Sequence, residues 1–224
     1  MKVIGLTGGT GSGKSTVSAY LREKGCYIID ADKISRKLTA KGGEALEPIR
    51  ERFGEEVFLE DGSLNRKKLG SIVFNDNQKL KILEGITTEI VIRKTLEEVE
   101  KLKAEGKQSI VVLDAPLLFE CGMKDCTDEN WLVTCEKEMR IQRLMSRDGL
   151  ERQSILDRMA NQLSDEEKLL LADYVIDNST NLTKLYSQID RLIERLVRLN
   201  IISETILDWN IDNNPCYRCC ILQC

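Results

Sequence analysis

Residues Gly8 to Ser15 read Gly-Gly-Thr-Gly-Ser-Gly-Lys-Ser, which is the spacing of a phosphate-binding loop. Glycines let such a loop curl, so that successive N–H groups and the N-terminus of the following helix attract phosphate oxygens. A lysine at the position of Lys14 reaches the β- and γ-phosphates. A hydroxyl at the position of Ser15 can ligate the Mg²⁺ that bridges these phosphates. The motif therefore predicts a nucleoside triphosphate site. The residues that we expect to bind the nucleoside triphosphate are Gly11, Ser12, Gly13, Lys14, Ser15 and Thr16.

The segments on either side of this loop predict a parallel sheet. A short apolar run at 3–6 precedes the loop, and Val17, Tyr20 and Leu21 follow it with helical spacing. Residues 26–30 then have the character of a second buried strand. The order strand, helix, strand implies a parallel pair joined by a right-handed crossover, and ligands of such sheets lie outside the carboxyl ends of the strands.

Two acids follow the second predicted strand, Asp30 and Asp32. Because that strand is expected to run parallel to the first, both carboxylates should emerge at the same edge as the phosphate-binding loop. Either acid is also of a type that caps a helix or lies in a solvated loop. Asp32 is the stronger candidate for a role at the site.

A third acid ends the strongest strand in the chain, residues 109–114, whose unbroken apolar run suits a sheet covered on both faces. At its tip Asp114 could hold Mg²⁺ through a water molecule or orient an acceptor hydroxyl. It could also simply cap the next segment. Asp114 is therefore included among the candidate substrate-binding residues.

Between the second and third of these strands the pattern is helical, and a run of this length cannot be a simple loop. We expect an all-helical insertion, residues 32–107, which covers the site and holds the second substrate. A small hairpin is expected at 59–64. Helices are predicted at 32–40, 44–53 and 88–105, with two more capped by Asn65 and Asn75.

After a fourth strand at 131–135, the segment 136–161 is helical and rich in arginine, and we expect Asp148-Gly149 to break it into two helices. Arg140, Arg143 and Arg147 are three and four residues apart and so share one helix face. Such a face is often merely solvated. Placed after a strand at the nucleotide edge, the group suits a mobile lid that brings cations to a transferring phosphoryl group.

A capping box at Ser164, a short strand at 172–178 and a long amphipathic helix at 182–199 complete the pattern. The predicted fold is α/β, a doubly wound parallel sheet of about five strands with a helical insertion and a helical lid. The expected division is a nucleotide-binding core at 1–31, 108–136 and 172–208, the insertion at 32–107, the lid at 137–171 and a Cys-rich tail at 209–224.

The amino-acid composition excludes several kinds of catalytic and metal site. The 224 residues include no histidine, which excludes a serine–histidine or cysteine–histidine nucleophile and a zinc site that uses imidazole. The net charge of −4 and the lack of a strongly basic block argue against nucleic acid as a partner. With no apolar run of membrane-spanning length and no signal peptide, we expect no membrane partner and a cytoplasmic protein. A monomer or weak homo-oligomer is expected.

The eight cysteines fall into two groups. Four are scattered, and we expect them to be reduced, with some buried as small hydrophobic residues. The other four, at the end of the chain, could in principle bind zinc through thiolates, but a frayed terminus is the preferred interpretation. These terminal cysteines are Cys216, Cys219, Cys220 and Cys224.

Five separated motifs, taken in this order, resemble the dephospho-coenzyme A kinase family, and the resemblance covers about residues 1–200. The first motif is shared by many nucleotide-binding proteins, whereas the combination is much more specific. The five motifs are Ile4 to Ser15, Ile29 to Asp32, Asp114 to Glu120, Gln142 to Asp148 and Ala172 to Asn178.

The resemblance implies a P-loop kinase fold with a helical CoA-binding region and a lid. The implied reaction moves the γ-phosphoryl group of ATP to the ribose 3′-hydroxyl of dephospho-CoA, the last step of coenzyme A synthesis. Asp32 resembles the acid that meets the acceptor hydroxyl, Thr7 lies beside the phosphate-binding loop as a substrate-binding candidate, and Arg143 and Arg147 resemble lid arginines. With Lys14 and Mg²⁺, these arginines would stabilise the transferring group.

One departure from the family pattern is visible, because Thr88-Glu89 stands where the family usually has His-Pro. Substrate contacts of that histidine would have to be made differently here. Two alternatives stay open, a kinase of another nucleoside or small metabolite, and a nucleotide-dependent switch. Substrate profiling separates the first, and stimulation of hydrolysis by a protein or nucleic acid would favour the second.

Overall fold

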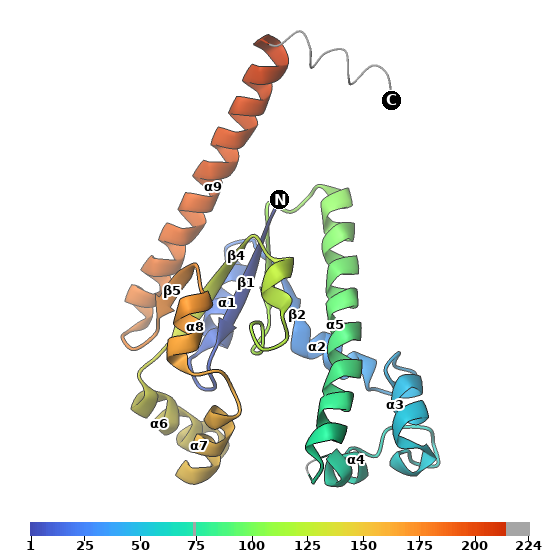
Figure 1. Ribbon diagram of the computed structural model, residues 1–224. Helices are drawn as coiled ribbons and strands as arrows, with labels where there is room; N and C mark the ends of the chain where they lie inside the picture. Colours follow the sequence, from blue (N-terminus) through green and yellow to red (C-terminus); the bar gives the residue numbers. More distant parts are fainter. Residues whose placement is uncertain (74, 214–224) are drawn as a thin grey trace, which may run out of the picture. The chain divides into compact units, whose positions relative to one another are not determined.

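The computed structural model describes residues 1–73 and 75–213 (Figure 1). The chain divides into two compact units, Met1–Ser179 and Thr180–Cys224, which are described separately. The first unit holds the sheet and all of the predicted site residues.

Five parallel strands form one sheet in the order β2-β3-β1-β4-β5. The phosphate-binding loop follows the middle strand and leads into α1, Lys14–Glu23. This confirms the predicted doubly wound α/β fold. The strands are β1 Lys2–Gly8, β2 Tyr27–Asp30, β3 Ile110–Asp114, β4 Glu129–Thr134 and β5 Tyr174–Asp177.

The register of the strands brings their carboxyl ends together. Asp114 at the end of β3 pairs with Leu6 of β1 on one side and with Asp30 of β2 on the other. The centre of the sheet is buried on both faces, and Val111, Val112 and Leu113 have no exposed surface. The apolar run that predicts this strand is what a parallel sheet covered by helices requires.

The insertion is helical, as predicted. Helices α2, α3 and α4 contact the long helix α5, which runs beside them in Figure 1. The predicted hairpin reduces to a single antiparallel bridge between Phe58 and Leu64. The helices are α2 Ala31–Leu38, α3 Leu46–Phe53, α4 Arg66–Val73 and α5 Asn77–Glu105, with a 3-10 turn at Glu55–Val57.

Two local predictions in this insertion need correction. The sequence predicts separate helices starting near Asn75 and Thr88, whereas α5 is one helix of 29 residues. Its cap is Asp76, whose side chain accepts from the backbone N–H groups of Gln78 and Lys79. The other predicted cap, Asn65, is confirmed, because its Oδ1 accepts from the N–H of Lys68 at 3.0 Å.

The arginine-rich segment forms three helices, α6 Lys137–Asp148, α7 Arg152–Ala160 and α8 Asp165–Leu171. The predicted break between the first two is confirmed at Gly149, whose φ of 65° lies in the left-handed region that favours glycine. The capping box of Ser164 and Glu167 is also present and begins α8.

The second unit is described through α9, Leu182–Asn213. Its start is as predicted, and the side chain of Asn181 accepts from the N–H of Lys184 at 3.0 Å. The helix continues well past the predicted end at 199 and into the predicted tail, while all four terminal cysteines lie outside the described residues. None of the helices described here has the length and hydropathy needed to cross a membrane.

Candidate active site

Glycines give the phosphate-binding loop its shape. Gly11 and Gly13 have φ values of 81° and 87°, a backbone conformation that L side chains rarely adopt. A Cβ on Gly13 would also lie 2.0 Å from Nδ2 of Asn178, which donates a hydrogen bond of 2.8 Å to the carbonyl of Ser12. The loop therefore has its curled conformation, with Asn178 supporting it from the end of β5.

The ammonium group of Lys14 pairs with Oδ1 of Asp114. Both side chains are largely buried, with exposed fractions of 17% and 12%. The first residue of α1 thus meets the last residue of β3, as expected if the strand ends converge on one site. A bound phosphate would compete with Asp114 for this cation.

Asp32 lies in the first turn of α2, within electrostatic reach of the same pair. Burial raises the pKa of its carboxyl, the charge of Lys14 opposes that rise, and the neighbouring charges of Asp30 and Asp114 add to it. Asp30 has the other predicted role and caps α2, because its Oδ1 accepts from the N–H of Lys33 at 2.9 Å. Of the two acids, Asp32 is the one that faces a cavity.

That cavity has a volume of about 570 Å³, within the range of small-molecule sites. Four parts of the chain form its wall: helix α2, the middle of helix α5, the segment that follows β3 and the connection between α7 and α8. Asp32, Ser35, Glu84, Gly85, Thr87, Thr88, Val91, Ala115, Pro116, Leu117, Glu120, Cys121 and Asn161 are among its lining residues. A polar and apolar pocket therefore adjoins the acid beside the phosphate-binding loop.

Thr7 contacts the cavity wall through the segment that follows β3. Its side chain is fully buried, and its hydroxyl donates to the carbonyl of Pro116 at 3.1 Å. The hydroxyl of the predicted substrate-binding residue is thus engaged with the segment after β3. Thr7 holds the lining residues Pro116 and Leu117 near the end of the sheet.

The two residues that depart from the family pattern also have defined places. Thr88 lies in the cavity wall, where its hydroxyl donates to Sγ of Cys121 at 3.9 Å. Glu89 continues α5 without a break and lines a separate surface hollow together with Ile92 and Arg93. At the position where the family usually has histidine, this chain therefore presents the small hydroxyl side chain of Thr88 in the cavity wall.

The two predicted lid arginines have different surroundings. Arg143 donates to the carbonyl of Asn178 at 3.1 Å, and its Nη1 would lie 3.7 Å from a Cβ on Gly13. Arg147, one turn further along α6, has a side chain that is 69% exposed and pairs with Asp148 at 2.7 Å. Only Arg143 adjoins the phosphate-binding loop, whereas Arg147 has the solvated position that was the alternative for this helix face.

Two further residues hold the loop in place, one of them the third arginine of the predicted lid face and the other a glutamine that the sequence does not single out. Arg140 is buried, donates from Nε to the carbonyl of Thr10 at 2.9 Å, and pairs with Asp165 at 2.7 Å. Gln162 accepts from both the N–H and the hydroxyl of Thr10, at 3.0 and 3.1 Å. The sequence predicts Arg140 as one of three arginines on a lid helix face, and the structure shows that it holds the loop through Thr10. No spacing signal marks Gln162, which lies in a connection between helices.

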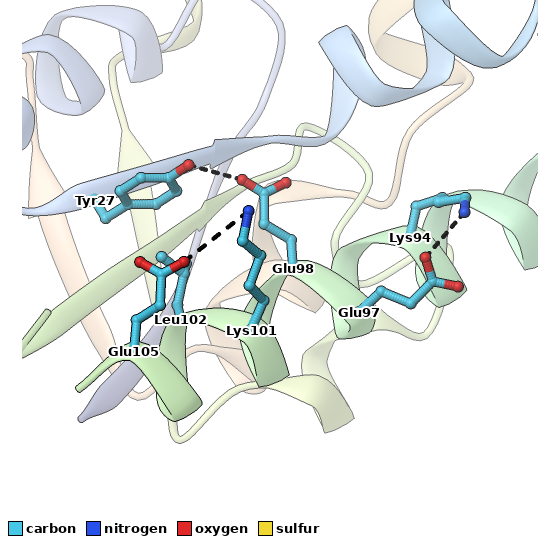
Figure 2. Close-up of a pocket in the computed structure, with 7 residues that line it drawn as sticks. All are labelled: Tyr27, Lys94, Glu97, Glu98, Lys101, Leu102 and Glu105. Carbon is cyan, nitrogen blue, oxygen red and sulfur yellow. Dashed lines mark hydrogen bonds and ion pairs between the residues drawn. The ribbon is translucent and has the colours of Figure 1, made fainter. Parts of the chain in front are cut away.

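A second hollow of about 430 Å³ lies between β2 and α5, and its ionisable side chains interact with one another (Figure 2). Tyr27 donates to Glu98 at 2.9 Å, and this hydrogen bond is the main cause of the raised pKa of the phenol. Lys94 pairs with Glu97 at 2.9 Å. The Tyr27–Glu98 hydrogen bond fastens α5 to β2, and the site at the strand ends is the better candidate for catalysis.

The described residues contain no group of three or more cysteine, aspartate or glutamate side chains arranged to hold a metal ion. Cys26, Cys121, Cys126 and Cys135 are free, as predicted. Ser15, the predicted Mg²⁺ ligand, is exposed in the first turn of α1. Its single hydroxyl fits an ion that keeps several waters and takes its remaining ligands from substrate phosphates, which is the usual behaviour of Mg²⁺.

Comparison with known proteins decides the family. Residues 2–184 match the family model described as Dephospho-CoA kinase. The chain belongs to the dephospho-CoA kinase family. A relative named dephospho-CoA kinase from Carboxydothermus hydrogenoformans is 42% identical over 195 residues, 87% of this chain and 94% of the relative. One from Listeria monocytogenes is 40% identical over 197 residues, 88% and 98% of the two chains.

Two solved structures with a similar fold cover most of this chain. The dephospho-CoA kinase from Campylobacter jejuni is 30% identical, with a TM-score of 0.66 and coverage of 88% of this chain and 98% of that one. The structure of TT1252 from Thermus thermophilus is 34% identical, with a TM-score of 0.74 and coverage of 87% and 97%. The predicted family is thus confirmed, and with it a kinase of coenzyme A biosynthesis that uses ATP as phosphoryl donor.

Proposed function

We propose that this member of the dephospho-CoA kinase family transfers the γ-phosphoryl group of ATP to the ribose 3′-hydroxyl of dephospho-CoA, giving coenzyme A and ADP. The observation that carries the proposal is the convergence of Lys14, Asp114 and Asp32 at one sheet edge, between a phosphate-binding loop and a cavity. The loop would hold the donor, and the cavity formed by α2 and α5 would hold the acceptor.

On the donor side, backbone N–H groups of the loop and the start of α1 would bind the phosphates. Lys14 would leave Asp114 and bind the β- and γ-phosphates, which carry more charge than one carboxylate. The Ser15 hydroxyl would hold Mg²⁺, with Asp114, released from Lys14, as a ligand through water. When bound, Mg²⁺ would neutralise charge that develops on the phosphate oxygens.

On the acceptor side, Asp32 would accept a hydrogen bond from the attacking hydroxyl. Phosphoryl transfer passes through a loose transition state in most analyses, so the hydroxyl loses its proton late and mainly needs to be aligned. A carboxylate at the cavity wall, beside Lys14, is suited to that alignment. Residues 32–107 would form the acceptor-binding insertion.

Arg143 would complete the site from the lid, residues 137–171. Its guanidinium is already beside Gly13, so a small movement of α6 would place it on the transferring phosphoryl group. A preorganised cation at that point stabilises charge in the transition state with little reorganisation. Arg147, paired with Asp148 in this structure, would contribute only if that pair opened.

The proposal is tested by measuring ADP release with dephospho-CoA, adenosine, AMP and other nucleosides as acceptors. We expect efficient release with dephospho-CoA and a product whose new phosphate is on the 3′-oxygen. Preference for another acceptor would instead support a kinase of a different small metabolite. Release that depends on an added protein or nucleic acid would support a nucleotide-dependent switch.

A further inference from the structure

A lysine is completely buried in the lid. Lys168 of α8 has no exposed surface, and its Nζ lies 2.9 Å from Oε1 of Glu120. The approach is that of an ion pair without the alignment of a hydrogen bond. Removing an ammonium group from water is costly unless an opposite charge compensates it, so the two side chains stabilise each other's position.

Glu120 connects two parts of the chain. It belongs to the segment after β3 and lines the cavity beside Asp32. The same Oε1 that faces Lys168 accepts a hydrogen bond of 3.1 Å from the backbone N–H of Leu163. The wall of the acceptor cavity is therefore fastened to residues 161–168, which we call the strap.

The strap also holds the phosphate-binding loop. Gln162 accepts from the N–H of Thr10 at 3.0 Å, and Asp165 pairs with Arg140, which donates to the carbonyl of Thr10. The first residue of the strap, Asn161, lines the acceptor cavity. One short segment thus contacts the proposed donor site through Thr10 and the proposed acceptor site through Glu120.

We infer that Lys168 and Glu120 are positioning residues, which set the distance and orientation of the acceptor cavity relative to the phosphate-binding loop. The inference rests on the proposed function, because it assigns the pair a role in aligning acceptor and donor. A misplacement of about 1 Å between reacting groups costs on the order of 100-fold in rate. Neither residue needs to touch a substrate to have this effect.

The test uses Glu120→Gln and Lys168→Met in the full chain. The glutamine keeps an oxygen for the N–H of Leu163 but removes the charge facing Lys168. We expect kcat for dephospho-CoA to fall by about 10- to 100-fold, while the KM for ATP changes by less than about twofold. More than one ADP should also form per acceptor phosphorylated, because water replaces a misplaced hydroxyl.

A matched control is available on the surface of the same lid. Arg152 and Glu138 form an exposed pair, so Arg152→Met removes a similar ion pair that does not join the two sites. It should leave kcat and the ratio of ADP to product unchanged. If Lys168→Met does not fold, the double variant with Glu120→Gln replaces it, because it has no unpaired buried charge and should fold. It should still form more than one ADP per acceptor phosphorylated.

A purely structural pair would give a different result. The variants would then melt at lower temperature, but the folded enzyme would keep the wild-type kcat and form one ADP per product, which would overturn the inference. Failure of the wild-type enzyme to phosphorylate dephospho-CoA would contradict the proposed function. That outcome is separate from an effect of Glu120 or Lys168.

Discussion

Three charged side chains lie close together at the end of the sheet. Their mutual attraction and repulsion determine how they are paired before a nucleotide binds. Lys14 neutralises Asp114, while Asp32 is partly buried and its charge is opposed by two neighbouring acids. A nucleotide would remove Lys14 from Asp114, since a triphosphate attracts the ammonium more strongly. The acids would then be free to meet an acceptor hydroxyl and a hydrated cation.

Replacing Asp32 by asparagine tests the acceptor side. Asp32→Asn should lower kcat by about 100- to 1000-fold, because an amide is a poor acceptor for the proton of an attacking hydroxyl. The KM for ATP should change by less than about twofold. Asp30→Asn is the matched control, since asparagine also caps a helix and Asp30 caps α2. Ordinary turnover of the Asp32 variant would remove this residue from the mechanism.

The raised pKa of Asp32 predicts a pH dependence. Because burial shifts this pKa upward, the carboxyl takes up a proton at a higher pH than an ordinary aspartate does. The protonated form cannot accept the hydroxyl proton, so kcat/KM for dephospho-CoA should fall as the pH decreases through the raised pKa. A kcat/KM profile of the wild type and Asp32→Asn checks this. An identical acidic limb in both enzymes would assign it to another group.

Alanine substitutions at two glycines with similar backbone conformations separate the cost of backbone strain from the cost of a steric clash. Gly13 and Gly25 have φ values of 87° and 88°, but a Cβ on Gly25 would meet no atom within 4 Å. Both alanine variants should lose about 1–2 kcal/mol of stability from the left-handed backbone. Only Gly13→Ala, which would collide with Asn178, should also lose nucleotide binding, measured by titration calorimetry with ATP. Equal affinities in the two variants would contradict the loop geometry.

At the scale of the elements, helix α6 separates two arginines that share a face. Arg143→Met should lower kcat by about 100-fold, because it removes the cation beside the phosphate-binding loop. Arg147→Met should have an effect of less than about threefold, because this exposed side chain pairs with Asp148. Steady-state kinetics of both variants check this prediction. A larger effect of Arg147 would mean that lid closure opens its ion pair.

The helices show where local signals were sufficient. Asn65, Gly149 and the capping box of Ser164 begin or end helices as predicted, because each acts on backbone groups within a few residues. The division of α5 was wrong, because Gly85 and the polar residues around it weaken helix propensity without preventing the helix. A glycine inside a helix costs only about 1 kcal/mol, which packing of the insertion helices against α5 offsets.

For the whole molecule, the sheet and the convergence at its edge could be predicted because both follow from chain order. Apolar strands alternating with helices imply parallel pairing, which brings Lys14, Asp32 and Asp114 to one side. The contacts of the strap could not be predicted. Thr10 and Gln162 are 152 residues apart in the sequence. Lysine is a residue type that is mostly exposed, so the sequence alone would place Lys168 on the surface, and only its pairing with Glu120 explains its burial.

The central claim is that the phosphate-binding loop and the cavity beside Asp32 hold donor and acceptor for one in-line transfer. Phosphorus-31 NMR of the enzyme with ATP, Mg²⁺ and dephospho-CoA tests it directly. We predict a new phosphomonoester signal on the ribose 3′-oxygen, appearing at the same rate as ADP and nearly lost in Asp32→Asn. ADP with inorganic phosphate and no new phosphomonoester, or a phosphate on another oxygen, would contradict it.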